Sequence, residues 1–546
     1  MNRFPKHLAQ TLFGALLLAC LCAAPALAGA ADCTGISTDK GPVTGVDNKG
    51  VCEYKGIPFA APPVGDLRFR LPRPAAPWAE PLMADTFRAE CYQTPMVDLG
   101  ANKKPTGDED CLYLNIWAPT KDIDAKKPVM LFIHGGGFQH GSGIMDTYYG
   151  ARLAATGDVV VVTINYRLGP FGFFLHPALA DPDGSNEGNY GMYDQVQAMK
   201  WVQANIASFG GDPGNVTLFG ESAGGMSIAM HLTSPLAKGL FQKAIIESGP
   251  VFLLSKTIGE LMPVGQAIAE NLGCTDPAAA AECLRTLPAE DILLKVKSGI
   301  MFLDTPGSTE KFPSEPLAGG KLYPMTAAAA FRSGNFQKDI PVIIGTNKDE
   351  ASFFVFNDKL DTRADFDAKL AKDTSKMEAI MGTSVMDQTI LDFYDPDKYE
   401  TPRKAYAELM GDMAFACPTR INASQMASQG APVFLYHFTH EPEGVEMLGD
   451  WGAFHGSELP FVFGNMTFLG MKFPYANNKK VSRKVMGLWA GFAHTGVPSY
   501  EDAPAWPPYD PDKQAYMELS LDMKAGAAFK KDRCEAFQKV LGDLFK

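Results

Sequence analysis

Five residues near the middle of the chain carry a pattern that is typical of nucleophilic serine chemistry. Gly220–Gly224 reads G-E-S-A-G, which places Ser222 between two glycines. The preceding run Val216–Gly220 has strand character, and the run that follows, AGGMSIAMHL, can begin a helix. A sharp strand-to-helix turn projects a serine hydroxyl from the edge of a sheet. The pattern therefore predicts a nucleophile at Ser222, and the alternative interpretation is a glycine-rich turn without chemistry.

A second glycine-rich segment follows another predicted strand. Phe132–Ser142 reads FIHGGGFQHGS and contains three successive glycines. Backbone N–H groups that no side chain obstructs can form an oxyanion hole. The segment lacks the G-K-[ST] ending of a phosphate-binding loop, and an ordinary flexible loop is the remaining alternative. The two segments in this order favour a catalytic site over two unrelated loops.

Longer segments make the chain similar to a known family. It resembles the type-B carboxylesterase family of α/β-hydrolases, which includes the cholinesterases. The resemblance runs from about Gly41 to Phe537 and includes the family's nucleophile signature over Phe209–Gly224. Four other segments also carry it: YKGIPFAAPPVGDLRF (54–69), EDCLYLNIWAP (109–119), NYRLGPFGF (165–173) and WAGFAHTGVP (489–498).

The resemblance also supplies partners for Ser222. The segment GTNKDEASFF (345–354) implies Glu350 as the catalytic acid, and WGAFHGSELPFVFG (451–464) implies His455 as the base. Their order in the chain, nucleophile, acid and base, is that of α/β-hydrolases. The same matching implies oxyanion-hole donors at Gly136, Gly137 and Ala223, and polar residues beside the triad at Glu221, Ser248 and Glu458.

A triad of this kind implies a serine carboxylesterase that hydrolyses carboxylic esters through an acyl-enzyme intermediate. The resemblance implies no metal and no organic cofactor. The expected partner is a small-molecule ester, and the sequence leaves its acyl and alcohol groups and the choice between monomer and homodimer open. A lipase or amidase with the same triad is one alternative. A non-catalytic binding protein is a more distant one, because relatives of that kind have lost triad residues. The net charge of −13, without a Lys/Arg cluster, argues against a nucleic-acid partner.

Alternating runs along the chain predict the elements that hold these residues. Tyr193–Phe209 has apolar residues at helical spacing. Strand and helix alternate, which predicts an α/β-hydrolase fold with a central, mostly parallel sheet flanked by helices. The Ala-rich residues 258–336 are expected to form helical cap insertions. Short apolar runs typical of buried parallel strands occupy Val129–Ile133, Val159–Ile164, Val216–Gly220 and Pro341–Asn347.

The first residues have the features of an export signal. Basic residues precede an apolar run over Leu12–Ala24, and Ala26–Ala28 offers a small-x-small cleavage site. The apolar run is shorter than the ~20 residues that a membrane-spanning helix needs. We therefore expect a signal peptide at 1–28, a hydrolase domain at 29–546, and a secreted or periplasmic protein without a membrane span. Lipoprotein-type processing at Cys20 is the alternative.

Cysteine usage agrees with export. Of the ten cysteines, Cys20 and Cys22 lie in the expected signal peptide, which leaves an even number for an oxidising compartment. No spacing is C-x-x-C and no histidine cluster accompanies them, which argues against a zinc site. Neighbours in the sequence favour the pairs Cys33–Cys52, Cys91–Cys111 and Cys274–Cys283, leaving Cys417 with Cys534. The resemblance supports the last three pairs, while the first rests on proximity alone.

Overall fold

The computed structural model describes most of the chain. The expected signal peptide at 1–28 lies outside the described residues. The described residues are 33–95, 104–121, 125–181, 186–251, 256–296, 298–299, 312–381, 386–445, 449, 451–468 and 470–540.

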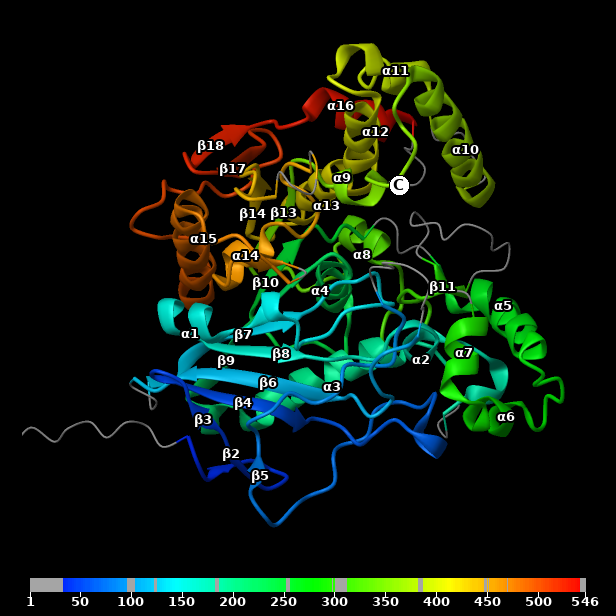
Figure 1. The fold of residues 1–546 in the computed structure, drawn as a ribbon, viewed down its shortest axis with the longest axis vertical. Coiled ribbons are helices and arrows are strands. Elements are labelled where there is room, and N and C mark those ends of the chain that lie inside the picture. Colours follow the sequence, from blue (N-terminus) through cyan, green and yellow to red (C-terminus); the bar gives the residue numbers. More distant parts are fainter. Residues whose placement is uncertain are drawn as a thin grey trace, which may run out of the picture.

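A sheet of 11 strands runs through the described part of the molecule (Figure 1). The strands from β17 to β8 in the spatial order are mutually parallel, and antiparallel strands extend both edges. The predicted mostly parallel sheet is therefore confirmed. In spatial order the strands are β18 (Lys524–Ala527), β17 (Ala515–Leu519), β14 (Val433–Phe438), β13 (Val342–Asn347), β10 (Lys243–Glu247), β9 (Gly211–Glu221), β7 (Lys127–Ile133), β8 (Val160–Ile164), β6 (Tyr113–Pro119), β4 (Val51–Pro58) and β3 (Val46–Asp47).

The predicted elements form, with shifted ends. The four apolar runs predicted as strands fall in β7, β8, β9 and β13, and β9 starts earlier than predicted, at Gly211. The predicted helix begins at Tyr190 and ends at Asn205, and the next residues form a short 3-10 turn, Ile206–Phe209. Gly210 closes this turn with φ 80°, a left-handed conformation that suits glycine and stops helices.

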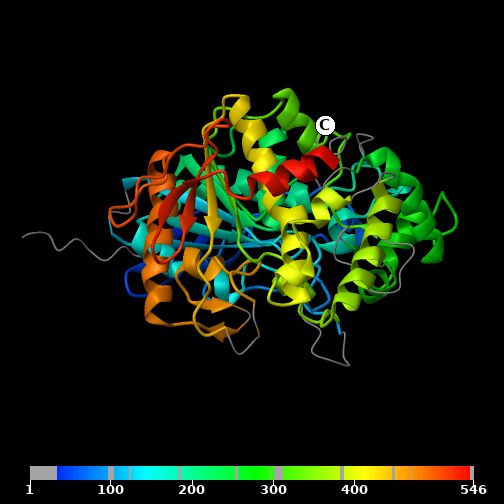
Figure 2. The same ribbon diagram turned by 90° about the horizontal axis from the view of Figure 1, so that it is seen from above.

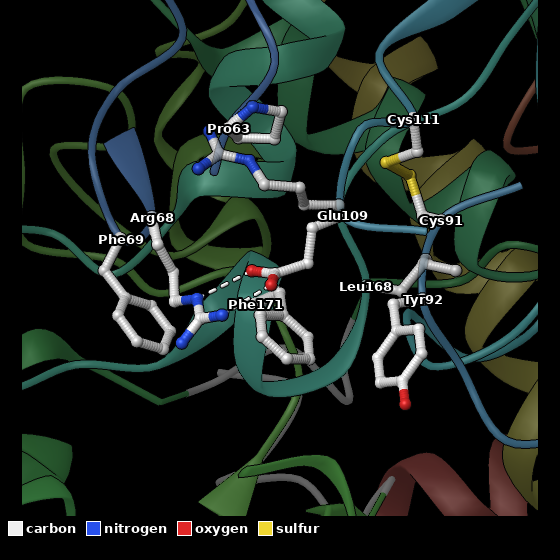
Figure 3. A pocket seen from close by; sticks show the side chains of 10 residues that line it. Pro63, Arg68, Phe69, Cys91, Tyr92, Glu109, Cys111, Leu168 and Phe171 are labelled. Atoms are coloured by element: carbon white, nitrogen blue, oxygen red, sulfur yellow. Dashed lines mark hydrogen bonds and ion pairs between the residues drawn. A yellow bond between two sulfur atoms is a disulfide. The ribbon is translucent and has the colours of Figure 1, made fainter. Parts of the chain in front are cut away.

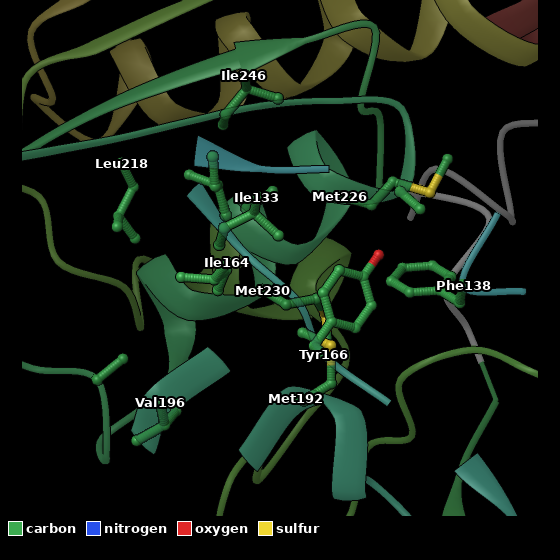
Figure 4. Packing of buried hydrophobic residues seen from close by; sticks show 14 of the residues in the cluster. Ile133, Phe138, Ile164, Tyr166, Met192, Val196, Leu218, Met226, Met230 and Ile246 are labelled. Carbon is green, nitrogen blue, oxygen red and sulfur yellow. The ribbon is translucent and has the colours of Figure 1, made fainter. Parts of the chain in front are cut away.

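Helices cover both faces of the sheet (Figures 1 and 2). Successive residues of β7 point to opposite faces. Ile133 therefore packs with Met230 and other side chains of α3 and α4 (Figure 4), and Leu131 belongs to the same cluster. Phe132 instead packs with Leu488 and other side chains of α1 and α15. Burial on both faces explains why these strands are continuously apolar. The covering helices are α1 (Ala151–Gly157), α3 (Tyr190–Asn205), α4 (Ala223–Thr233) and α15 (Ala476–Thr495).

The segment 258–336 does contain helices. In Figure 1, α5, α6 and α7 gather at one side of the molecule, beside the short helix α2. Helix α8 instead packs against α4 and α13. The bounds of these and the remaining helices are α2 (Gly169–Phe173), α5 (Ile258–Asn271), α6 (Ala280–Thr286), α7 (Ala289–Lys295), α8 (Ala327–Ser333), α9 (Ser352–Val355), α10 (Arg363–Met381), α11 (Gln388–Leu391), α12 (Pro402–Gly411), α13 (Cys417–Ser428), α14 (Leu459–Phe463) and α16 (Lys531–Val540).

The carboxyl ends of the central strands meet at one edge of the sheet. Ile133 at the end of β7 lies opposite Gly220 of β9, and Glu221 lies opposite Glu247 at the end of β10. Glu247 in turn lies opposite Gly345 of β13. Segments that follow these strands are therefore brought side by side, as is usual for ligand sites in open parallel sheets.

Four disulfides join the described cysteines in the pairs expected from the sequence. The longest closure, Cys417–Cys534, spans 117 residues and fastens α16 to the start of α13. None of the helices within the described ranges combines the length and apolar character that crossing a membrane requires. The other three disulfides are Cys33–Cys52, Cys91–Cys111 and Cys274–Cys283.

Candidate active site

Ser222 occupies the turn between β9 and α4. Its backbone has φ 55° and ψ −122°, a region that residues with a side chain rarely adopt. Two hydrogen bonds hold it there, from its N–H to Glu247 O at 2.9 Å and from Met226 N–H to its own carbonyl at 2.8 Å. A Cβ atom at Gly224 would lie 1.9 Å from Ile133 O, so only glycine fits there. The predicted strand–turn–helix geometry around Ser222 is present.

The glycine loop after β7 passes directly beside this turn. A Cβ atom at Gly135 would lie 3.0 Å from Ser222 Cβ, so the loop and the serine are in contact. Gly136 and Gly137 have φ values of 97° and 63°. Among the described residues, the N–H groups of Gly136, Gly137 and Ala223 donate no hydrogen bond. These three predicted oxyanion-hole donors are thus near Ser222 and available to a ligand.

Buried aromatic and imidazole rings support the glycine loop. His134 stacks on Tyr166 with ring centroids 4.4 Å apart, and Tyr166 Oη donates to His134 O at 2.9 Å. His134 Nδ1 donates to Gly135 O at 2.8 Å. Burial lowers the pKa of His134 to about 4, so the ring stays neutral at physiological pH. His134 is therefore a structural residue.

A buried carboxylate and an imidazole form the second half of the site. Glu350 Oε2 lies 2.6 Å from His455 Nδ1. Its other oxygen accepts hydrogen bonds from Ser248 Oγ at 2.5 Å and Asn347 N–H at 2.8 Å. Burial acts to lower the pKa of His455, but the carboxylates of Glu221 and Glu350 outweigh it and raise that pKa well above its ordinary value.

The opposite nitrogen of His455 faces the residue before the serine. Glu221 Oε1 lies 3.0 Å from His455 Nε2, although this oxygen accepts no hydrogen bond from any described residue. No hydrogen bond joins Ser222 Oγ to His455 among the described residues. Such contacts in hydrolases often align only when substrate is bound. The structure thus brings His455 to the Ser222 turn but leaves their proton-transfer contact unformed.

Two further glutamates are buried in the same cluster. Burial raises the pKa of Glu458 well above its usual range, and one of its oxygens accepts from Asn347 Nδ2. Burial also raises the pKa of Glu247 to about 8, with Glu221 nearby adding to the effect. Trp489 Nε1 donates to Glu247 Oε1. Sequence reasoning missed Glu247, although an acidic residue ending the apolar strand segment KAIIE was a signal for it.

We expect Glu247→Gln to stabilise the protein increasingly as pH rises. The folded state holds the carboxyl proton up to about pH 8, whereas an unfolded chain releases it near its usual pKa of 4.5. Unfolding therefore becomes easier by roughly 1.4 kcal/mol per pH unit across this window, and glutamine removes that loss. Urea unfolding at pH 5 and pH 8 should show the variant's advantage growing by on the order of 2–4 kcal/mol.

The exposed Glu501 provides the matched control for this measurement. Glu501→Gln changes a side chain that is exposed to solvent, so its effect on unfolding should be the same at both pH values. If Glu247→Gln also changes the free energy of unfolding by the same amount at both pH values, the prediction is contradicted.

Two ion pairs, one buried and one partly buried, lie apart from this cluster. Arg68 binds both oxygens of Glu109, at 2.7 and 2.5 Å, and Arg167 binds both oxygens of Asp194, at 2.8 and 2.7 Å. Figure 3 shows the first pair beside the Cys91–Cys111 disulfide, where the two line a small pocket. None of Ser222, Glu350 and His455 is in its lining, which consists of Pro63, Arg68, Phe69, Cys91, Tyr92, Glu109, Cys111, Arg167, Leu168 and Phe171.

The sheet order and the strand–turn–helix around Ser222 are those of an α/β-hydrolase fold. Comparison with known proteins gives the family, because residues 32–537 match the model of the carboxylesterase family. The chain belongs to the carboxylesterase family and is a carboxylic ester hydrolase.

Individual relatives agree with this assignment. A para-nitrobenzyl esterase of Bacillus subtilis (strain 168) is 38% identical over 494 residues, covering 89% of this chain and 95% of that protein. Carboxylesterase 1E of Mus musculus is 36% identical over 524 residues, covering 90% of each protein. The solved structure of a thermophilic PNB esterase matches with a TM-score of 0.77 at 34% identity, covering 92% of this chain and 99% of its own.

Proposed function

We propose that Ser222, His455 and Glu350 carry out the ester hydrolysis. Ser222 Oγ attacks the carbonyl carbon of the ester while His455 Nε2 accepts the hydroxyl proton. The negative charge that develops on the carbonyl oxygen is bound by N–H groups of the glycine loop and of Ala223. His455 then passes the proton to the alkoxide, so the alcohol leaves and an ester of Ser222 remains.

The second half of the reaction repeats these steps with water. His455 takes a proton from the water, whose oxygen attacks the carbonyl of the acyl-enzyme. Collapse of the intermediate returns the proton to Ser222 Oγ and releases the carboxylic acid. Glu350 keeps the proton of His455 on Nδ1 throughout and stabilises the imidazolium.

The observation that carries this proposal is the contact between the strained serine turn and the open glycine loop. Backbone strain of this kind persists only where surrounding contacts enforce it, and it occurs mainly at functional sites. Unpaired N–H groups are rare in protein interiors, and here they lie next to Ser222. The Glu350–His455 pair, held by Ser248 and Asn347, supplies the base.

The test combines labelling with a substrate panel. An organophosphate should modify one serine and abolish activity, and peptide mass spectrometry should locate the adduct on Ser222. p-Nitrophenyl esters of different acids should show an initial burst of product followed by steady turnover. The p-nitroanilides of the same acids separate an esterase from an amidase, because we expect much slower cleavage of the amide. An adduct elsewhere, with activity lost, would overturn the assignment of Ser222.

We expect the acid limb of the pH profile of kcat/KM to lie above the ordinary histidine pKa of ~6.5. The neutral form of His455 is the base, and Glu221 and Glu350 hold its pKa well above the usual value despite burial. Glu221→Gln removes one of the two charges. The limb should therefore move to lower pH by about one unit or more, as measured between pH 5 and pH 10.

Glu441→Gln provides a control for this shift, because Glu441 pairs with Lys348 at the surface. The acid limb of the kcat/KM profile of Glu441→Gln should coincide with that of the unmodified enzyme. If the limb of Glu221→Gln stays in place or moves to higher pH, the ionising group is not His455 beside Glu221.

We also propose that the protein acts outside the cytoplasm, as a secreted or periplasmic enzyme. The export features of residues 1–28 and the four disulfides support this location. The mature protein from the producing cell should then begin at Gly29. A lipid-modified N-terminus at Cys20 would show lipoprotein processing instead, and an intact Met1 would contradict export.

A further inference from the structure

A π-helical turn interrupts the long helix that passes the candidate site. Helices α12 and α13 are continuous through Asp412–Ala416, the turn η7, where Cys417 N–H donates to Asp412 O five residues back. The sequence explains the distortion. Pro418 has no N–H, and in an α-helix its ring would clash with the carbonyl of Ala414 four residues earlier. Single π-helical turns of this kind occur frequently at functional sites.

The turn is anchored by the C-terminal helix. Asp412 is fully buried, and its carboxylate accepts hydrogen bonds from Tyr394 Oη at 2.8 Å, from Lys530 Nζ and from Arg533. At the other end of the turn, the Cys417–Cys534 disulfide binds it to α16. Figures 1 and 2 both place α16 beside the α12–α13 helix. The residues between the two anchors therefore have little freedom to move.

One of the anchored residues packs on the imidazole of His455. The ring of Phe415 lies 4.7 Å from the His455 ring, centroid to centroid, with the planes tilted by 45°. Phe354, which follows Glu350 closely in the chain, lies 5.0 Å from the same imidazole at 48°. The two phenyl rings are nearly parallel, 6.0 Å apart with 3° between their planes. Phe415 is only 9% exposed, so its place is determined by packing.

These ring contacts restrict the orientation of the imidazole, which the Glu350–His455 hydrogen bond does not do by itself. The contacts at Nδ1 and Nε2 lie in the plane of the imidazole and do not support its faces, so the ring can still tilt about the line that joins the two nitrogens. The reaction requires Nε2 to stay directed at Ser222 while His455 takes up and then returns a proton. Aromatic packing against the ring restricts this tilt, and a phenyl face also favours the imidazolium form.

We propose that Phe415 is a positioning residue for His455 and that the π-helical turn η7 exists to hold it against the imidazole. The proposal rests on the function of His455 as the base. It assigns Phe415 an effect on the rate of the chemical steps, exerted through His455, and not on the binding of substrate.

Kinetics of Phe415→Ala on p-nitrophenyl acetate test this assignment. We expect kcat to fall by about 10- to 100-fold, since misplacement of a reacting group by about 1 Å can cost 10²-fold. KM should change by less than about threefold, because the residue acts on the chemical steps. Phe415→Leu, which refills the space with an apolar side chain, should restore most of kcat. If the alanine variant does not fold, Phe415→Val takes its place, and its kcat should lie below that of Phe415→Leu.

Phe366→Ala is the matched control. Phe366 is also buried, at 3% exposed, in α10, where its ring meets Tyr406 at 5.7 Å, and it has no ring contact with His455. Both alanine variants leave a cavity and should lose thermal stability to a similar extent, but the control should keep its kcat. Equal loss of kcat in both variants would show that Phe415 acts only through stability.

Two further outcomes would overturn the proposal. One is an unchanged kcat in Phe415→Ala, and the other is a change confined to KM for bulky esters, which would make Phe415 a wall of the substrate pocket. Failure of this inference is distinguishable from failure of the proposed triad. If the triad is correct and Phe415 is not a positioning residue, Ser222→Ala still abolishes turnover while Phe415→Ala is normal.

Discussion

Ser222→Ala should give a folded protein in which kcat for p-nitrophenyl acetate is about 10⁶-fold lower, because a catalytic triad works as a unit. The substitution removes only the hydroxyl that attacks the ester. Alanine tolerates the strained backbone of the turn about as well as serine, and the hydrogen bonds to Glu247 O and Met226 N use backbone atoms. Thermal unfolding should therefore change little. Activity is measured in a preparation purified away from any host esterase.

Ser227→Ala is the control for the loss of a hydroxyl. Ser227 lies one turn further along α4, fully buried, and its Oγ donates to Ala223 O at 2.8 Å. Removing it should lower stability by about 1 kcal/mol and leave kcat within a few-fold of the original. Turnover that persists in a clean Ser222→Ala preparation would show that another residue is the nucleophile.

Glu350→Gln should lower kcat by about 10⁴-fold, because the amide forces the wrong tautomer on His455. Two donors, Ser248 Oγ and Asn347 N–H, point at one oxygen of Glu350. The amide oxygen of glutamine must take that place, which turns its NH₂ group toward His455 Nδ1. Nδ1 then accepts a hydrogen bond instead of donating one, so the proton moves to Nε2. A protonated Nε2 cannot accept the proton of Ser222.

Glu187→Gln tests whether loss of any buried carboxylate has this effect. Glu187 is 6% exposed and accepts hydrogen bonds from Lys321 and Leu322 N–H, in a different part of the molecule. Its substitution should affect stability without lowering kcat appreciably. Comparable rates for Glu350→Gln and the unmodified enzyme would remove Glu350 from the triad. NMR of the imidazole nitrogens would check the tautomer directly.

The sequence predicted those elements whose local pattern reflects their final environment. Strands β7 and β8 are buried on both faces, so their residues are continuously apolar and recognisable. The short edge strands β3 and β18 are exposed and have the composition of loops. β10 also escaped prediction, because its few apolar residues are flanked by Lys243 and Glu247.

The site was predictable to a different extent for each residue. Ser222 and the glycine loop have local signals, because the turn and the loop need glycines at fixed positions. Glu350 and His455 have none, since they meet only after the sheet has formed, and the family resemblance alone pointed to them. Phe415 was missed for the same reason. Pro418 signals a disturbed helix, but the sequence does not tell which distant side chain the disturbed turn will contact.

The anchoring of η7 by α16 ties completion of the site to the order in which the chain is made. Ser222, Glu350 and His455 all leave the ribosome before α16, since synthesis proceeds from the N-terminus. The last anchors of the turn, Arg533 and Cys534, arrive only with that final helix. With Phe415 holding His455 as we propose, a precursor that lacks a docked α16 contains the nucleophile without a fixed base. Ester hydrolysis then reaches its full rate only once α16 has docked and the Cys417–Cys534 disulfide has formed.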